Sequence, residues 1–280
     1  MKKLPFPLVD DVLALQELSQ NRRVASYPTL SSVEGNVLEQ YRIYDVSGGD
    51  PWLIDPLTLP DGLPDNLRKH YSLPPEGLSF LAKIRDEGSP DVCPMCGSLK
   101  TGTLDHYLPK TYYPEFAIYS KNLIPACDCN TLRKDSYRGD SPTERPLHPY
   151  YHSCLENRLY RAGISGDFLY PTITITTCCG PIADLLSVQF HLEIIIKKTR
   201  VVKWLESKWA KLIERPDVMI RNLPDGQITV DQLIDALEFT LFNYDEEHDT
   251  PNNWHSFFYA GILAWNDSLD LLTSRINALR

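Results

Sequence analysis

The sequence predicts an α+β protein in which a small zinc-binding unit is embedded in a mainly α-helical chain. Three observations lead to this expectation. Apolar residues recur every three or four positions over residues 182–215, which is typical of an amphipathic helix. A β-branched run over residues 173–177 indicates a strand. Four of the seven cysteines lie between residues 93 and 129, and in a reducing compartment such clustering favours a metal over disulfides.

The chain divides into an N-terminal helical region over residues 1–90, a cysteine-bearing segment over 91–150 and a mainly helical region over 151–280. The first region has apolar residues at helical spacing over 8–18, with Asp10 as a candidate cap. Further helices are expected over 33–44 and 74–85. The turn sequence Gly88-Ser89-Pro90 marks the boundary that follows.

The C-terminal region begins with a turn-rich stretch over 146–181 that contains one expected strand, 168–177. A single long helix is expected over 182–215, followed by one over 230–242 and another over 254–279. Basic residues crowd the second half of the long helix. A solvated basic face explains them, and contact of Lys197, Lys198, Arg200 and Lys203 with a phosphate backbone is the alternative.

Composition and charge exclude several classes of protein. With 42% hydrophobic and 10% aromatic residues, the chain is predicted to fold. No secretory signal and no segment of membrane-spanning length is found, so a soluble cytoplasmic protein is expected. The net charge of −9 is concentrated at the two ends, whereas residues 93–145 are nearly neutral and residues 193–216 are basic. Because local charge decides phosphate contact, the total does not exclude a nucleic-acid partner.

The cysteine spacing predicts a structural zinc site. Cys93 and Cys96 form a C-x-x-C at a tight turn, and Cys127 and Cys129 supply a second thiolate pair. Four thiolates make a closed tetrahedral site that stabilises a small unit. A single residue separates the second pair, so either the site is slightly distorted or Cys127 is a buried thiol and another group replaces it. Cys154, Cys178 and Cys179 are expected to be buried thiols that pack as small hydrophobes.

Between the cysteine pairs lie residues suited to hydrolysis of a phosphodiester. Histidine titrates near neutrality, so His106 is a candidate general base. The Asp105 carboxylate and the Asn130 amide offer the oxygen donors that Mg²⁺ or Mn²⁺ prefers. Asp105 and His106 are adjacent on an expected strand and would face opposite sides, unless a bend before Pro109 intervenes.

This segment, over roughly residues 93–137, resembles the HNH endonuclease family in its zinc-bearing branch. The resemblance lies in Cys93-Pro-Met-Cys96, Asp105-His106-Tyr-Leu-Pro109, Asn122-Leu-Ile-Pro and Cys127-Asp-Cys129-Asn130. It implies a ββα-metal core with His106 as the base, Asp105 and Asn130 as ligands of the catalytic ion, and Asn122 fixing the loop that orients the base. The four cysteines fall on the zinc ligands.

The resemblance also implies a function and partners. The chain is expected to be a metal-dependent HNH endonuclease that hydrolyses DNA, with Mg²⁺ or Mn²⁺ at the catalytic site and structural Zn²⁺. Lys110, Arg133 and Lys134 are candidate nucleic-acid contacts. The wording of the motifs is similar to HNH proteins of bacterial phage-defence operons, including the partner of the Septu ATPase and its counterpart in retron systems. An ATPase of such an operon is therefore a candidate partner protein.

Two alternatives remain at this stage. The zinc unit could be catalytically inactive and serve as an adaptor that binds nucleic acid or a partner protein. A thiol redox protein built on Cys93 and Cys96 is less compatible with the sequence, because the redox motif prefers a helix directly after the cysteines and a Gly-Ser turn follows here.

Overall fold

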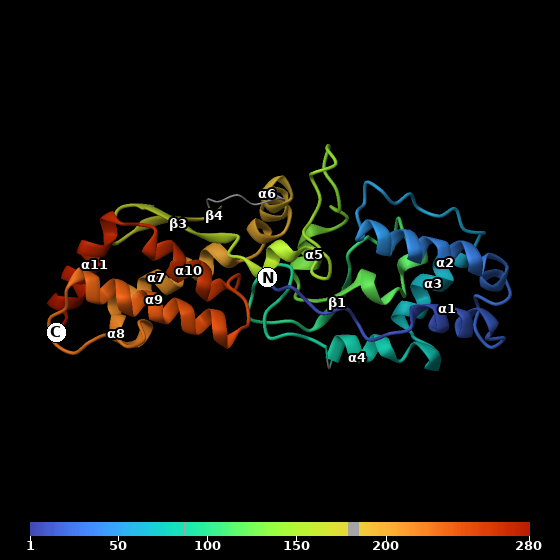
Figure 1. The fold of residues 1–280 in the computed structure, drawn as a ribbon, viewed down its shortest axis with the longest axis horizontal. Helices are drawn as coiled ribbons and strands as arrows, with labels where there is room; N and C mark the ends of the chain where they lie inside the picture. Colours follow the sequence, from blue (N-terminus) through green and yellow to red (C-terminus); the bar gives the residue numbers. More distant parts are fainter. Residues whose placement is uncertain (87, 179–184) are drawn as a thin grey trace.

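The computed structural model describes residues 1–86, 88–178 and 185–280. These residues form a mainly helical α+β structure with two lobes, as Figure 1 shows. Helices α1–α4 belong to one lobe and α7–α11 to the other, and residue 1 lies at the junction. None of the described helices is long and apolar enough to cross a membrane.

The first lobe consists of helices that surround a small hairpin. They are α1 (Asp11–Gln20), α2 (Thr29–Ser47), α3 (Leu63–Ser72) and α4 (Phe80–Asp86), with a 3₁₀ turn η1 (Glu76–Leu78) before α4. The Asp10 side chain accepts a hydrogen bond from the Leu13 amide at 2.9 Å, so the predicted cap of the first helix is confirmed. Helix α3 was not predicted from the sequence.

The hairpin of the first lobe is formed by β1 (Thr103–His106) and β2 (Leu123–Ala126). The strands are antiparallel, with Asp105 opposite Ile124 and His106 opposite Leu123. The loop between them contains two 3₁₀ turns, η2 (Pro114–Phe116) and η3 (Ser120–Asn122). The short helix α5 (Cys129–Arg133) follows β2 directly. Two strands and a helix therefore carry the motif residues in sequence order.

The second lobe packs helices against a second hairpin, formed by β3 (Tyr160–Gly166) and β4 (Pro171–Thr177). A 3₁₀ turn η4 (Ser153–Glu156) precedes β3. The predicted strand is confirmed as β4, whereas β3 was not predicted. The helices that follow are α6 (Leu185–Ile194), α7 (Val201–Glu214), α8 (Pro216–Met219), α9 (Val230–Glu247), α10 (Trp254–Leu263) and α11 (Asp267–Ala278).

The long helix predicted over 182–215 is interrupted in the structure. Helix α6 ends at Ile194, and a 3₁₀ turn η5 (Ile196–Lys198) separates it from α7. Ile195 is buried in the core of the first lobe and Ile196 in the core of the second. Burial of two neighbouring side chains in different cores requires a change of backbone direction, which overrides the helical periodicity. The single helix predicted over 254–279 is likewise two helices, α10 and α11.

Two hydrophobic cores organise the chain. The first core joins residues from 1–90 with residues from 91–150, and includes all four clustered cysteines. The second is built mainly from residues after 151 and also contains Met1 and Leu147. The N-terminal helices and the motif segment therefore share one core, which fixes α3 and α4 against the hairpin.

Candidate metal centre and active site

Four buried cysteines converge between the first hairpin and α5. The sulfur atoms of Cys93, Cys96, Cys127 and Cys129 all lie within 4.8 Å of one another. The Sγ atoms of Cys93 and Cys129 are 3.7 Å apart, and those of Cys96 and Cys127 are 3.4 Å apart. Both members of the C-x-C pair therefore face the cluster, and the alternative in which Cys127 packs elsewhere is excluded. Four sulfur donors at this separation suit a structural zinc ion.

The ionisation of the four thiols indicates the same chemistry. Hydrogen bonds to neighbouring thiols hold the pKa of Cys93 well below its usual value despite its burial, and the hydrogen bond with Cys129 lowers the pKa of Cys127 to about 7. Burial raises the pKa of Cys96, and hydrogen bonds from the other thiols raise that of Cys129. Without a cation, one thiolate suppresses ionisation of its neighbours. A divalent ion removes this conflict because it favours all four thiolates together.

Residues after 151 donate hydrogen bonds to the main chain of the turn formed by residues 93–97. The Trp254 indole donates to the Cys96 carbonyl at 2.8 Å, and the Trp254 amide donates to the Gly97 carbonyl at 3.0 Å. His191 Nε2 donates to the Met95 carbonyl at 2.6 Å. Gly97 has a φ of +79°, and a side chain there would collide with the Asn252 carbonyl. The cysteine cluster thus lies where the two lobes meet.

His106 is buried at the end of β1 with a defined tautomer. Its Nε2 is 2.9 Å from the Ala117 carbonyl oxygen. A carbonyl can only accept, so Nε2 carries the hydrogen and Nδ1 of the neutral ring keeps the lone pair. Burial lowers the pKa of His106 to about 3, and the cations Lys110 and Arg133 contribute to the lowering. The ring is therefore neutral at physiological pH with its lone pair on Nδ1, and burial in this conformation disfavours its protonation.

Asp105 lies next to His106 and is bound by Arg133. One carboxylate oxygen accepts from the His106 amide at 2.5 Å, and the other is 3.1 Å from Arg133 Nη2. Burial raises the pKa of Asp105, while Arg133, the His106 amide and Asn130 oppose the rise. Asn130, in the first turn of α5, helps to oppose that rise and therefore lies near the carboxylate. The Asp105 carboxylate thus contacts the main chain of His106, whereas the imidazole of His106 bonds to the Ala117 carbonyl.

Asn122 fixes the loop that carries the partner of His106. Its side-chain oxygen accepts from the Leu108 amide at 2.7 Å and from the Tyr44 hydroxyl at 3.0 Å. Its amide nitrogen donates to the carbonyls of Leu108 at 3.1 Å and Phe116 at 3.2 Å. Because Phe116 precedes Ala117, these bonds hold the carbonyl that selects the His106 tautomer. A fully satisfied, fully buried amide is well suited to this structural role.

Asp105 and Asn130 offer two side-chain oxygen donors, and a hard cation held there would need further ligands from water or substrate. Among the described residues, the four cysteines form the group in which three or more side chains are close enough to bind one metal ion. Their donor atoms are sulfur, which a hard cation does not prefer. Mg²⁺ is commonly held by one or two protein oxygens together with water and substrate phosphate, so two protein oxygens are sufficient. In this conformation Arg133 occupies one side of the Asp105 carboxylate. Cation binding there requires the guanidinium to release an oxygen.

The three predicted nucleic-acid contacts have different surroundings. Lys134 is exposed and Lys110 is half-buried. Arg133 differs from the expectation of a surface contact, because its side chain is 2% exposed and its Nη2 also donates to the His106 and Tyr107 carbonyls. Its Nε and Nη1 are buried and have no hydrogen-bond partner among the described residues. The helix directs Arg133 inward, to the site that also contains Asp105.

The cysteines outside the cluster differ from the prediction of full burial. Cys154, on η4, is half-buried and packs against the second core, and Cys178, directly after β4, is also half-buried. Cys179 lies outside the described residues. Neither Cys154 nor Cys178 belongs to the metal-ligand cluster.

Tyr71 is a site residue that sequence reasoning missed. Its ring lies 4.3 Å from the His106 ring, centroid to centroid, at an angle of 65°. Its hydroxyl donates to the Leu104 carbonyl on β1. Tyr71 belongs to α3, which lies outside the motif segment, and no spacing within the sequence connects it with His106.

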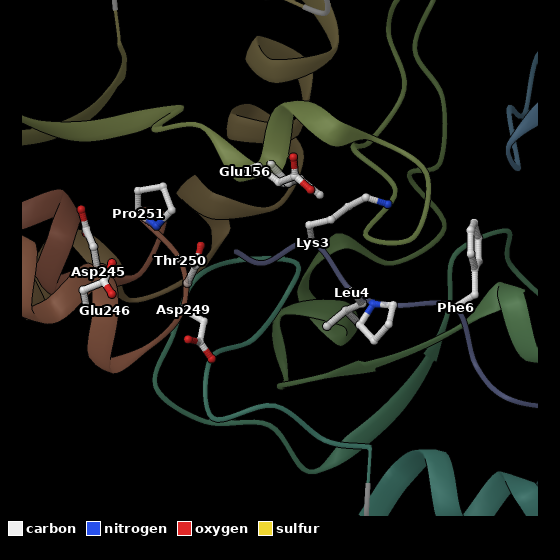
Figure 2. Close-up of a pocket in the computed structure, with 11 residues that line it drawn as sticks. Lys3, Leu4, Phe6, Glu156, Asp245, Glu246, Asp249, Thr250 and Pro251 are labelled. Carbon is white, nitrogen blue, oxygen red and sulfur yellow. The ribbon is translucent and has the colours of Figure 1, made fainter.

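A separate cavity of about 730 Å³ lies between the N-terminal segment and the turn after α9. Figure 2 shows Lys3, Leu4 and Phe6 at one side, and Asp245, Glu246 and Asp249 at the other. Acidic side chains outnumber the basic ones in its lining, so the cavity repels phosphate. None of the motif residues lines it, and it does not contribute to the proposed chemistry.

Comparison with known proteins shows a similarity to a phage protein. The chain is 30% identical over 197 residues to protein ea31 of Escherichia phage lambda. The alignment covers 59% of this chain and 63% of ea31, so the chain spans less than two thirds of that relative. No model of a protein family and no solved structure matches the chain. The name of ea31 states no activity.

Proposed function

We propose that the chain is a metal-dependent endonuclease of the HNH type that hydrolyses phosphodiester bonds in DNA. His106 is the general base, Asp105 and Asn130 hold one Mg²⁺ or Mn²⁺, and Asn122 fixes the loop around the base. The four cysteines hold a structural zinc ion. The ββα arrangement of β1, β2 and α5 supports this proposal, since neighbouring elements carry Asp105, His106 and Asn130.

The observation that carries the proposal is the hydrogen bond between His106 and Ala117. Donation from Nε2 leaves Nδ1 as the basic atom, and burial keeps the ring neutral. A general base needs a fixed tautomer and an available lone pair, and this hydrogen bond provides both.

Each of these residues has a separate role in the proposed reaction. His106 Nδ1 accepts the proton of the attacking water, and the Ala117 carbonyl stabilises the imidazolium that forms. A bound divalent cation would supply charge stabilisation for the phosphate and the leaving oxygen. Asp105 and Asn130 would hold that cation, after Arg133 releases the Asp105 carboxylate. Tyr71 limits the movement of the imidazole because its ring packs against it.

Plasmid nicking with added Mg²⁺ or Mn²⁺ tests the proposal directly. We expect His106→Ala to lose activity by about two to four orders of magnitude, the usual contribution of a general base. Zinc content should stay unchanged, because His106 does not touch the cysteines. His248→Ala, a half-exposed position in the second lobe, is the matched control. Equal nicking by the wild type and His106→Ala contradicts the assignment.

The adaptor alternative is favoured by a specific contact. Arg133 already neutralises the charge of the Asp105 carboxylate, so this carboxylate needs no catalytic cation to balance it. In that case the zinc unit binds nucleic acid or another protein and no hydrolysis occurs. Absence of nicking by the wild type in both metals, with the partner protein present and with normal zinc content, supports the adaptor.

The identity of the partner and the biological role follow from the resemblance alone. The excess of acidic residues at both ends of the chain suggests that targeting depends on another protein. We propose an ATPase of a phage-defence operon as that partner. A purified chain that cuts DNA at full efficiency and retains no protein from its own cell contradicts this.

A further inference from the structure

The His106 ring has an aromatic neighbour on α3, Tyr71, and two cationic side chains lie near that tyrosine. Tyr71 on α3 packs against the imidazole and donates to the main chain of β1. Lys110, in the loop after β1, has its Nζ 4.2 Å from the centroid of the Tyr71 ring. Arg85 on α4 lies near the Tyr71 side chain, and its charge opposes the rise in the Tyr71 pKa that burial causes. We call these three residues the Tyr71 wall.

Lys110 is held in place by contacts that leave its charge unpaired. Arg68 donates to the Lys110 carbonyl at 3.4 Å, and Asp65 balances the charge of Arg68 at 2.7 Å. The aromatic ring beneath the ammonium provides a cation–π contact. Among the described residues, no salt bridge involves Lys110 or Arg85. Burial and the nearby Arg68 lower the pKa of Lys110, while Asp105 opposes the change.

Among residues 1–86, 88–178 and 185–280, the charges beside His106 therefore do not balance. Arg133 compensates Asp105, and Arg68 compensates Asp65. The two cations of the Tyr71 wall remain, both partly shielded from water. A half-buried cation without a carboxylate is unfavourable unless an anion reaches it. A lysine and an arginine that both lie near one tyrosine ring can each bind an oxygen of a backbone phosphate.

We propose that Lys110 and Arg85, positioned by Tyr71, bind a backbone phosphate of double-stranded DNA next to the bond that His106 cleaves. The inference rests on the proposed function for the location of the cleaved bond, and it concerns binding rather than chemistry. It gives the N-terminal helices a role. Arg85 and Tyr71 lie outside the motif segment and reach the site only because both regions share one core.

The test is the affinity of the full-length chain for a short fluorescent DNA duplex, measured by anisotropy over a range of salt concentrations. All proteins carry His106→Ala, so no cleavage interferes. We expect Lys110→Met and Arg85→Met each to weaken binding roughly tenfold, the effect of losing a charge-assisted hydrogen bond. Each should also reduce the slope of log K against log salt by about one, because one fewer phosphate is neutralised.

Two controls separate charge from folding. Lys110→Arg retains the charge and should keep the slope of the parent protein. Lys83→Met removes an exposed charge on α4 two residues before Arg85, which places it on the opposite face of the helix, and should change affinity less than twofold. Melting temperatures show whether each variant is folded. If Lys110→Met does not fold, Arg85→Met and Lys110→Arg decide the question.

Three results overturn the inference. One is an unchanged salt slope in both methionine variants. Another is a salt dependence that decreases only when Lys198, Arg200 and Lys203, on and between η5 and α7, are replaced together. That result would assign the DNA contact to the second lobe. The third is a loss seen with an RNA duplex and not with DNA. If the wild type binds DNA through the Tyr71 wall but does not cleave it, the proposed function fails, and the phosphate contact stands without the cleaved bond beside it.

Discussion

Replacement of Arg133 by methionine tests the charge balance inside the site. The substitution keeps a long unbranched side chain and removes the guanidinium. Asp105 then loses the cation 3.1 Å away, and the carbonyls of His106 and Tyr107 lose their shared donor. Arg133 Nε and Nη1 have no partner among the described residues, so their loss breaks no further hydrogen bond. The effect of the substitution therefore comes from Nη2.

The expected magnitude is that of breaking a buried ion pair. Removing one partner of such a pair costs about 3–5 kcal/mol, because a charge remains buried without compensation. We expect Arg133→Met to reduce the free energy of unfolding by about 4 kcal/mol near neutral pH. For a chain of this size each kcal/mol lowers the melting temperature by about 2 °C, so a decrease of about 8 °C is expected.

The loss should depend on pH and on added cations. Burial raises the pKa of Asp105 and Arg133 opposes the rise, so removal of Arg133 raises this pKa further. The folded variant takes up a proton at Asp105 more readily than the folded wild type, and the difference in stability therefore decreases as the pH falls. If Asp105 can hold a divalent ion, Mg²⁺ or Mn²⁺ should stabilise the variant more than the wild type, because the ion replaces the missing charge.

Urea unfolding and thermal melting of zinc-loaded protein at about pH 7.5 and about pH 5.5 measure these differences. Lys134→Met, the exposed neighbour, is the matched control and should change stability by less than about 0.5 kcal/mol. An Arg133→Met protein as stable as the wild type, or one with the same loss at both pH values, would show that Asp105 is not the buried charge that Arg133 compensates.

Three further predictions follow from the structure. Cys93→Ser should abolish stoichiometric zinc binding and unfold the motif segment, whereas the control Cys154→Ser should retain the metal. Elemental analysis measures the zinc and circular dichroism measures the folding. Normal zinc content in Cys93→Ser would refute the four-sulfur site. Burial raises the pKa of Glu115 to about 7, so the stability that Glu115 contributes is present at low pH and is lost as the pH rises from about 4.5 through about 7. Glu115→Gln should therefore be more stable than the wild type by about 2–3 kcal/mol near pH 8 and equally stable near pH 4.5, and urea titrations that show no such divergence contradict the assignment. Lys134 has a φ of +54°, so Lys134→Gly should gain about 1 kcal/mol and Lys134→Ala should not, as thermal melting can test.

The sequence determined the parts of this protein that depend on short spacing. The two cysteine pairs predicted a four-sulfur site because each pair is nearly contiguous and the two pairs are joined by one hairpin. The same hairpin carries Asp105 and His106 at the end of β1, and Asn130 lies on the neighbouring helix because α5 begins soon after β2. The strand β4 was predictable because its β-branched residues suit an extended chain whatever covers it.

Only the tertiary structure decided which groups act on these residues. The interruption of the long helix arises because Ile195 and Ile196 enter different cores, and no local propensity encodes that choice. The His106 tautomer depends on a carbonyl that Asn122 fixes across the loop, and the state of Asp105 depends on the inward direction of Arg133. Tyr71 and Arg85 reach the site from distant helices. Such contacts come from packing of whole elements, whereas sequence spacing determines only what lies within one or two turns of chain.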